Sequence, residues 1–254
     1  MRARSLVTAF AVALGVVLAS GGGASAADEP GEVTPFIVGG TNATQTYSFM
    51  ASLQSSSGSH FCGGSLIKAN WIVSAKHCLS GRSATSVRAR IGTTNRTSGG
   101  TLASGAQIVL HPTYDIALLR LSTSVTQAPI PVAATSGATG TATRIIGWGQ
   151  TCAPSGGCGA PTTLQQLDTS IVSDGNCSGI YAAAEICTNN PGGNKGACYG
   201  DSGGPQVKSV GGAWQLIGAT SRAGNNSSTC ATAPSIYEDV PAFRSWISGY
   251  AGAV

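Results

Sequence analysis

The sequence is poor in charge and in aromatic side chains. Of its 254 residues, 9 % are charged and 6 % are aromatic, and the formal net charge is +4. The basic residues are scattered without a run of lysine or arginine, so no nucleic-acid-binding surface is expected. Hydrophobic residues still make up 42 % of the chain, which supplies a sizeable core and excludes a disordered chain.

Long apolar runs are missing beyond the N-terminus. The first residues, MRARS, are followed by the apolar run LVTAFAVALGVVLA and by the small residues Ala24, Ser25 and Ala26. This order is typical of a signal peptide, here 1–26, and the run is too short to span a bilayer comfortably. A membrane anchor is the alternative. General secretion is favoured over a twin-arginine route, because the two arginines are not adjacent. We expect a secreted, extracellular protein with no membrane in its mature form.

The chain has no C-x-x-C pair, and its histidines do not cluster with its cysteines, which disfavours a zinc site. An even number of cysteines in an exported chain instead predicts disulfides throughout, with the pairing left open by the spacing. The eight cysteines are Cys62, Cys78, Cys152, Cys158, Cys177, Cys187, Cys198 and Cys230.

After Phe36 the sequence consists of short apolar stretches separated by Gly, Ser, Thr, Asn and Pro, for example SVRARIG, IALLRL and AWQLIGAT. Several of them alternate, which predicts an all-β sandwich or barrel. One segment, YEDVPAFRSWISGY (237–250), has apolar residues at helical spacing after Pro241. The stretch TQAPIPVAATSGATG could join two β halves.

The stretch GACYGDSGGP, Gly196–Pro205, places Ser202 among glycines. The pattern G-x-S-x-G alone also fits an ordinary turn. A serine nucleophile needs a histidine base and an orienting carboxylate. The chain has three histidines, all before Ser202, which excludes the α/β-hydrolase order of the three residues. The subtilisin order would need an aspartate before the histidine, and only Asp28 qualifies, so the remaining order is histidine, aspartate, serine.

His77 ends the apolar stretch WIVSAKHC and is the favoured base, although a merely packed histidine is the alternative. His60 lies in a polar segment, SSSGSHFC, and is expected to be exposed. Asp115 directly precedes the apolar IALLRL, so its carboxylate is expected to be buried and to need a partner. Asp168 and Asp174 fit solvated turns.

These residues resemble the chymotrypsin/trypsin family of secreted serine endopeptidases, in a bacterial, actinobacterial-type form. The matching segments are IVGG at Ile37, SAKHC, DIALL, GWG at Gly147, GDSGGP and PSIYEDV. The resemblance implies two six-stranded antiparallel β-barrels with a C-terminal α-helix. The expected bounds are about 37–130 for the N-terminal barrel, about 131–237 for the C-terminal barrel and about 238–250 for the helix.

The resemblance also implies roles. Ser202 would attack the scissile carbonyl, His77 would be the base, Asp115 would orient it, and the N–H groups of Gly200 and Ser202 would form the oxyanion hole. The protein would be a zymogen with a propeptide, 27–36, and cleavage after Phe36 would let the ammonium of Ile37 pair with Asp201. No cofactor or metal is expected.

The primary pocket would have Gly196 and Ala197 at its base, Ala223 and Ser235 as walls, and Ser221 on the substrate-pairing strand. This predicts neutral, small-to-medium or apolar residues on the acyl side of the cleaved bond (P1), and excludes Arg and Lys. The resemblance implies the disulfides Cys62–Cys78, Cys177–Cys187 and Cys198–Cys230, which leaves Cys152–Cys158 as an additional pair.

Two residues depart from the family pattern. Lys76 stands where a small residue is usual, so its side chain must reach solvent, and Arg222 replaces a tryptophan. Expected partners are polypeptide or ester substrates and protein inhibitors, and the protein is expected to be a monomer. Two other functions remain open: hydrolysis mainly of esters or polyesters such as poly(lactide), and a non-catalytic binding role.

Overall fold

The computed structural model describes residues 37–254. The expected signal peptide, 1–26, and propeptide, 27–36, lie outside the described residues. Within 37–254, no helix combines the length and the apolar character that a membrane crossing requires.

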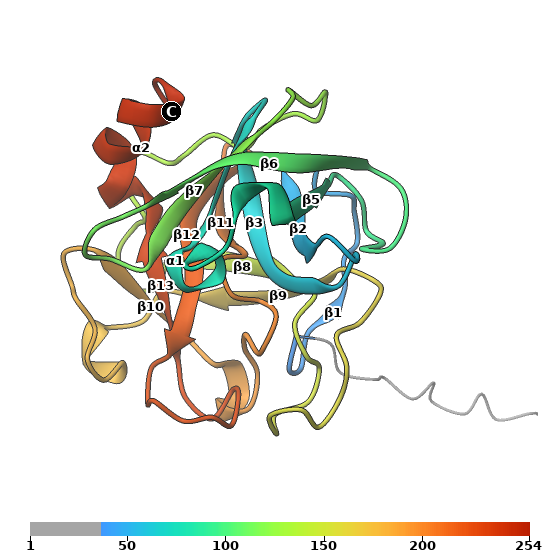
Figure 1. Cartoon of the computed structure of the whole chain (residues 1–254). Helices are drawn as coiled ribbons and strands as arrows, with labels where there is room; N and C mark the ends of the chain where they lie inside the picture. The colour runs from blue at the N-terminus through green and yellow to red at the C-terminus, as the bar shows by residue number, and fades with distance from the viewer. Residues whose placement is uncertain (1–36) are drawn as a thin grey trace, which may run out of the picture. The chain divides into compact units, whose positions relative to one another are not determined.

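The first half of the described chain forms a closed six-stranded antiparallel barrel in the order β2-β3-β4-β7-β6-β5 (Figure 1). Its inward side chains alternate along the strands, as in β5, where Val87, Ala89 and Ile91 are buried between more exposed arginines. The strands are β2 (Met50–Ser55), β3 (His60–Lys68), β4 (Trp71–Ala75), β5 (Val87–Ile91), β6 (Thr101–Leu110) and β7 (Ile116–Leu121).

The second half forms a seven-stranded antiparallel sheet in the order β1-β9-β8-β11-β12-β13-β10. A bridge between Ile171 and Thr188 joins the end of β9 to β10, so six of the strands come round on themselves. The seventh is the short β1, which adds to the edge of β9. The strands are β1 (Thr41–Asn42), β8 (Ala142–Gly147), β9 (Gln165–Ser170), β10 (Glu185–Thr188), β11 (Pro205–Val210), β12 (Ala213–Ala223) and β13 (Ser235–Asp239). The chymotrypsin-like fold expected from the resemblance is confirmed.

The C-terminal helix begins later than the sequence suggested. Residues Tyr237 to Asp239 belong to β13, because all three pair with β12 and the first two also pair with β10. Pro241 cannot donate to a ladder, and the chain turns through a short 3₁₀ segment, Val240–Phe243, into α2, Arg244–Ala251. The helix expected at about 238–250 is therefore corrected to these bounds.

The sheets meet where backbones approach closely, at glycines. A Cβ on Gly63 of β3 would lie 2.8 Å from Gly204 Cα, and one on Gly203 would lie 2.7 Å from Ala75 N and would overlap Ser74 Oγ. Gly203 also has a φ of 73°, which a larger residue adopts only with strain. These glycines therefore let the turn that carries Ser202 pack directly on the end of β4.

Four disulfides lie within the described residues: Cys62–Cys78, Cys152–Cys158, Cys177–Cys187 and Cys198–Cys230. They are the pairs expected above. The first ties β3 to α1 (Lys76–Leu79), the short helix that carries His77.

Candidate active site

His77 and Asp115 lie side by side because their strands are paired. β4 and β7 run antiparallel with Ala75 opposite Ile116, so the residues just beyond these two positions leave the barrel together. The His77 Nδ1 lies 2.8 Å from Asp115 Oδ2, and the His77 backbone N–H donates to Asp115 Oδ1 at 2.9 Å. The two contacts fix both oxygens of the carboxylate against one residue.

The Asp115 carboxylate is also held from the second sheet. The hydroxyl of Ser221, on β12, donates to Asp115 Oδ2 at 2.7 Å. Burial raises the pKa of Asp115, but the hydrogen bonds and charge of His77 and the hydroxyl of Ser221 outweigh it and hold that pKa below its ordinary value. An ionised carboxylate only accepts hydrogen bonds, so His77 Nδ1 carries a hydrogen, and in the neutral form of the ring Nε2 is the acceptor.

Ser202 lies on the turn before β11, against the first barrel. Its carbonyl accepts the N–H of Gly63 at 2.8 Å and the sulfur of Cys78 lies 3.7 Å away. Cys78 directly follows His77, so these contacts bring the Ser202 main chain to the segment that carries the histidine. Within 37–254, neither the Gly200 nor the Ser202 N–H donates to another protein group.

His60 supports the Gly200 turn, and the expectation that it is exposed is wrong. It is the first residue of β3 and is half-buried. Its Nε2 donates to the Gly200 carbonyl at 3.0 Å, and its Nδ1 accepts from Ser52 Oγ at 2.8 Å. Burial lowers the pKa of His60 to about 4, so the ring is neutral and holds one tautomer at neutral pH.

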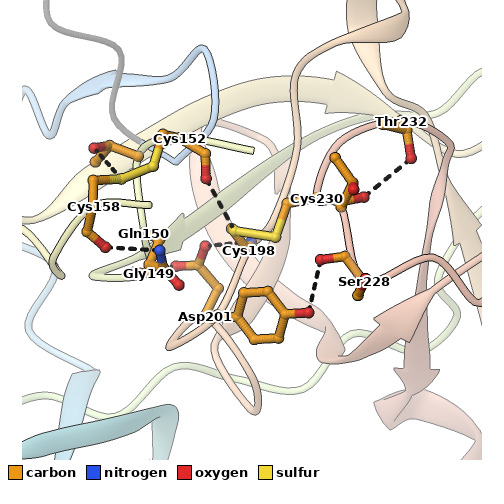
Figure 2. Close-up of a disulfide and its surroundings, with 12 residues drawn as sticks. Gly149, Gln150, Cys152, Cys158, Cys198, Asp201, Ser228, Cys230 and Thr232 are labelled. Carbon is orange, nitrogen blue, oxygen red and sulfur yellow. Dashed lines mark hydrogen bonds between the residues drawn. A yellow bond between two sulfur atoms is a disulfide. The ribbon is translucent and has the colours of Figure 1, made fainter. Parts of the chain in front are cut away.

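Asp201 is buried inside the turn (Figure 2). Its carboxylate accepts the N–H of Gly149 at 2.7 Å and the N–H of Cys198 at 2.9 Å. Burial raises the pKa of Asp201 to about 7, and the two backbone hydrogen bonds offset only part of this effect. No cation within the described residues forms a salt bridge with it.

A cavity of about 130 Å³ opens beside Ser202. It contains no carboxylate among its lining residues, which include the predicted Ala197, Ser221, Ala223 and Ser235. Gly196 is not among them, although a Cβ there would lie 3.8 Å from both Ala231 Cβ and Ser235 Oγ, which do line the cavity. The remaining lining residues are Cys198, Tyr199, Ser202, Thr220, Arg222, Ser227, Cys230 and Ala231.

Lys76 and Arg222, the two departures from the family pattern, have different surroundings. Lys76 Nζ donates to the Pro112 carbonyl at the surface, at 3.1 Å. Arg222 forms a two-bond ion pair with the buried Glu185, at 2.6 and 3.0 Å. The charge of Arg222 at the edge of the cavity is therefore already balanced by Glu185, on β10.

One group of metal-type donors occurs in 37–254, Cys62, His77 and Cys78. The two sulfurs are bonded to each other, so the group offers no thiolate to a metal.

A histidine–aspartate pair and a glycine-framed serine at the junction of two antiparallel β sheets define a chymotrypsin-like serine protease. The family model described as Trypsin matches residues 37–247, and the chain belongs to this family. It is 38 % identical over 237 residues to Trypsin alpha of Drosophila erecta, covering 86 % of this chain and 88 % of the relative.

Two further relatives give a similar result. Trypsin theta of Drosophila melanogaster is 35 % identical over 96 % of this chain and 97 % of its own. Trypsin of Sus scrofa is 37 % identical over a region that covers 67 % of this chain and 79 % of the relative. These relatives are animal proteins, so they do not support the bacterial, actinobacterial type suggested by the sequence.

We predict that His60→Ala lowers kcat about tenfold with little change in KM, because the Gly200 carbonyl loses its donor and the turn loses its support. Ser52→Ala leaves the Nε2 contact intact and is expected to cost less than threefold. Steady-state kinetics, normalised by active-site titration, measure both. Equal losses in the two variants would mean that the contact to Gly200 is not the important one.

Proposed function

We propose that the protein is a secreted serine endopeptidase, made as a zymogen, with His77, Asp115 and Ser202 as its catalytic residues. The observation that carries the proposal is the His77–Asp115 pair, with Nδ1 and Oδ2 2.8 Å apart, beside the turn of Ser202. The family relationship supports the endopeptidase activity.

In this proposal His77 Nε2 accepts the proton of Ser202 as its Oγ bonds to the carbonyl carbon of the substrate. Asp115 stabilises the resulting imidazolium, and the N–H groups of Gly200 and Ser202 hold the developing oxyanion. His77 then gives the proton to the leaving amine, which departs and leaves an acyl group on Ser202. Water, activated by the same histidine, releases the acyl group as a carboxylic acid.

Ser202→Ala is predicted to reduce kcat by roughly a thousandfold or more while leaving the fold intact, and His77→Ala to be about as damaging, because the three residues act as a unit. A serine-directed phosphonate should label Ser202 alone, as read by peptide mass mapping. Retained turnover in the Ser202→Ala variant would show that another nucleophile acts.

The zymogen proposal rests on Ile37 and Asp201. The side chain of Ile37 is buried in the core of the second sheet, with Ala197 packed against that cluster. The isolated β-bridge between Val38 and Gly196 joins the same segment to the irregular stretch that leads to Asp201. Ile37 also has a φ of 36°, a strained value for a β-branched residue. Cutting the bond before Ile37 removes this torsional constraint and supplies an ammonium group for Asp201.

We predict that active enzyme begins at Ile37, and that the uncleaved chain loses stability as pH rises from about 4 to 7. In that chain the folded-state pKa of Asp201, about 7, exceeds its ordinary 3.8, so the folded state binds more protons over this interval. The cleaved enzyme, in which the ammonium is paired with Asp201, should lose much less stability over the same pH interval.

The measurement is denaturant unfolding against pH in a Ser202→Ala background, with an added protease site before Ile37 to produce the cleaved form. Asp201→Asn in the uncleaved chain is the control, and it should remove the fall in unfolding free energy between about pH 4 and 7. Active enzyme whose N-terminal sequence starts at Ala27 would refute the zymogen proposal.

We also propose a neutral P1 pocket. The lining residues include no carboxylate that could pair with substrate Lys or Arg, and the one charged lining residue is Arg222. A dry apolar cavity of about 150 Å³ can hold benzene, so this cavity of about 130 Å³, open at its mouth, suits Ala, Val or Leu and takes Phe at its limit. Phe36 at the activation site fits that limit.

Substrates ending in Leu or Phe p-nitroanilide are predicted to be cleaved at least tenfold faster, by kcat/KM, than the matched Arg substrate, with the Ala substrate in between. The reason is the desolvation of a substrate cation in a pocket without a counter-charge. If the Arg substrate were cleaved fastest, the assignment of this cavity as the primary pocket would have to be abandoned.

A further inference from the structure

A second carboxyl group, that of Glu238, contacts the main chain of Asp115. Glu238, on β13, is fully buried. Its Oε1 accepts the backbone N–H of Asp115 at 3.3 Å, and its Oε2 has no hydrogen-bond partner among the described residues. A buried acid in contact with the main chain of a proposed catalytic aspartate is in a position to affect how that aspartate is held.

Three acidic side chains and one cation face one another here. Glu238 is opposite Glu185 in the ladder between β13 and β10, which places the two side chains on the same side of the sheet. Arg222 comes from β12, and Asp115 from the turn before β7. Arg222 donates to both oxygens of Glu185 at 2.6 and 3.0 Å and to the Gly179 carbonyl at 2.9 Å, and makes only a long bond, 3.4 Å, to Ser221 Oγ.

The hydrogen bonds show which acid is left without compensation. Asp115 accepts from the N–H and ring of His77 and from Ser221, and Glu185 accepts from Arg222. Glu238 accepts only one weak backbone bond, in a site with two other carboxylates. Burial, followed by the charges of Glu185 and Asp115, raises the pKa of Glu238 to about 8. Among these acids, Glu238 is therefore the one that is mostly protonated at neutral pH.

We propose that Glu238 is a positioning residue, a neutral buried acid that fixes the main chain of Asp115 by accepting its N–H. The proposal rests on the catalytic role proposed for Asp115. Glu238 is fully buried and bonds the main chain of Asp115, whereas His77 bonds its carboxylate, so Glu238 acts through that aspartate and does not touch substrate. Loss of the acceptor would free the Asp115 N–H in a buried site, and the carboxylate would shift relative to the imidazole.

Three variants separate this role from general stability. Glu238→Ala removes the acceptor. Glu238→Gln keeps an oxygen acceptor of similar length and is neutral at every pH. Asp239→Asn removes a neighbouring acid on the opposite face of the same strand, where Ser136 is the hydrogen-bond partner, and serves as the matched control.

The expected result is a loss of about tenfold in kcat for Glu238→Ala, with KM within twofold of wild type. Glu238→Gln should restore at least half of the wild-type kcat at pH 7, and Asp239→Asn should equal wild type. All rates are divided by the concentration of sites titrated with a serine-directed phosphonate, so a partly unfolded variant is not counted. Wild-type kcat in Glu238→Ala, or a Gln variant as slow as the Ala variant, would overturn the proposal.

A second readout does not depend on rates. The infrared spectrum of the cleaved enzyme at pH 7, in which Asp201 is paired with the ammonium of Ile37, should contain the carbonyl band of a protonated carboxyl group that is absent in Glu238→Gln and retained in Asp239→Asn. Stability should also fall between about pH 4.5 and 8 in wild type, because the folded state holds the Glu238 proton over that interval, and this part of the fall should vanish in Glu238→Gln. An unchanged infrared band in Glu238→Gln would refute the neutral acid. If wild type neither cleaves substrate nor reacts with the phosphonate, the proposed function fails instead.

Discussion

The Asp115 carboxylate is held by groups from both sheets, and the geometry of the site depends on it. His77, from the first barrel, contributes a backbone N–H and a ring nitrogen, and Ser221, from the second sheet, contributes a hydroxyl. A half-buried carboxylate with three donors is more favourable ionised than protonated, which is why its pKa lies below the ordinary value in spite of partial burial. A shift of either sheet would break at least one of these hydrogen bonds. The full set of three therefore forms only when the two sheets are correctly packed.

That junction is made of small residues because the segments that carry His77 and Ser202 come from different halves of the fold. The turn of Ser202 must reach the end of β4, and its backbone passes within van der Waals contact of Gly63 and Ala75. Any side chain at Gly203 would push the turn away from His77. The sequence motif around Ser202 is thus explained by packing as well as by chemistry: its glycines allow the approach, and the serine is the group brought close.

Short-range patterns in the sequence predicted the β class and the local motifs, and the two-barrel arrangement was implied by the family resemblance. Alternating apolar stretches indicated β structure, and the order of histidine, aspartate and serine excluded two other arrangements. His60 was wrongly expected to be exposed, since the groups that hold its ring, Ser52 and Gly200, are far from each other in sequence. Likewise, Glu238 reaches Asp115 only through the pairing of β13 with β10 and β12. The helix start was placed too early because ladder pairing overrode helical spacing.

Two buried acids in the second sheet show how the same burial leads to different chemistry. Burial raises the pKa of Asp201 to about 7 and that of Glu238 to about 8. Ile37 lies in the same core as the segment before Asp201, so cleavage of the chain can deliver a cation to that acid. Glu238 has no such source, because Arg222, the cation that faces it, is already bonded to Glu185. In the proposed activation, cleavage favours ionisation of Asp201, whereas Glu238 gains no cation in either form of the chain and its raised pKa keeps it mostly protonated at neutral pH. The protonation of Glu238, on β13, is therefore set by its burial and by the neighbouring acids, and it does not depend on cleavage of the chain.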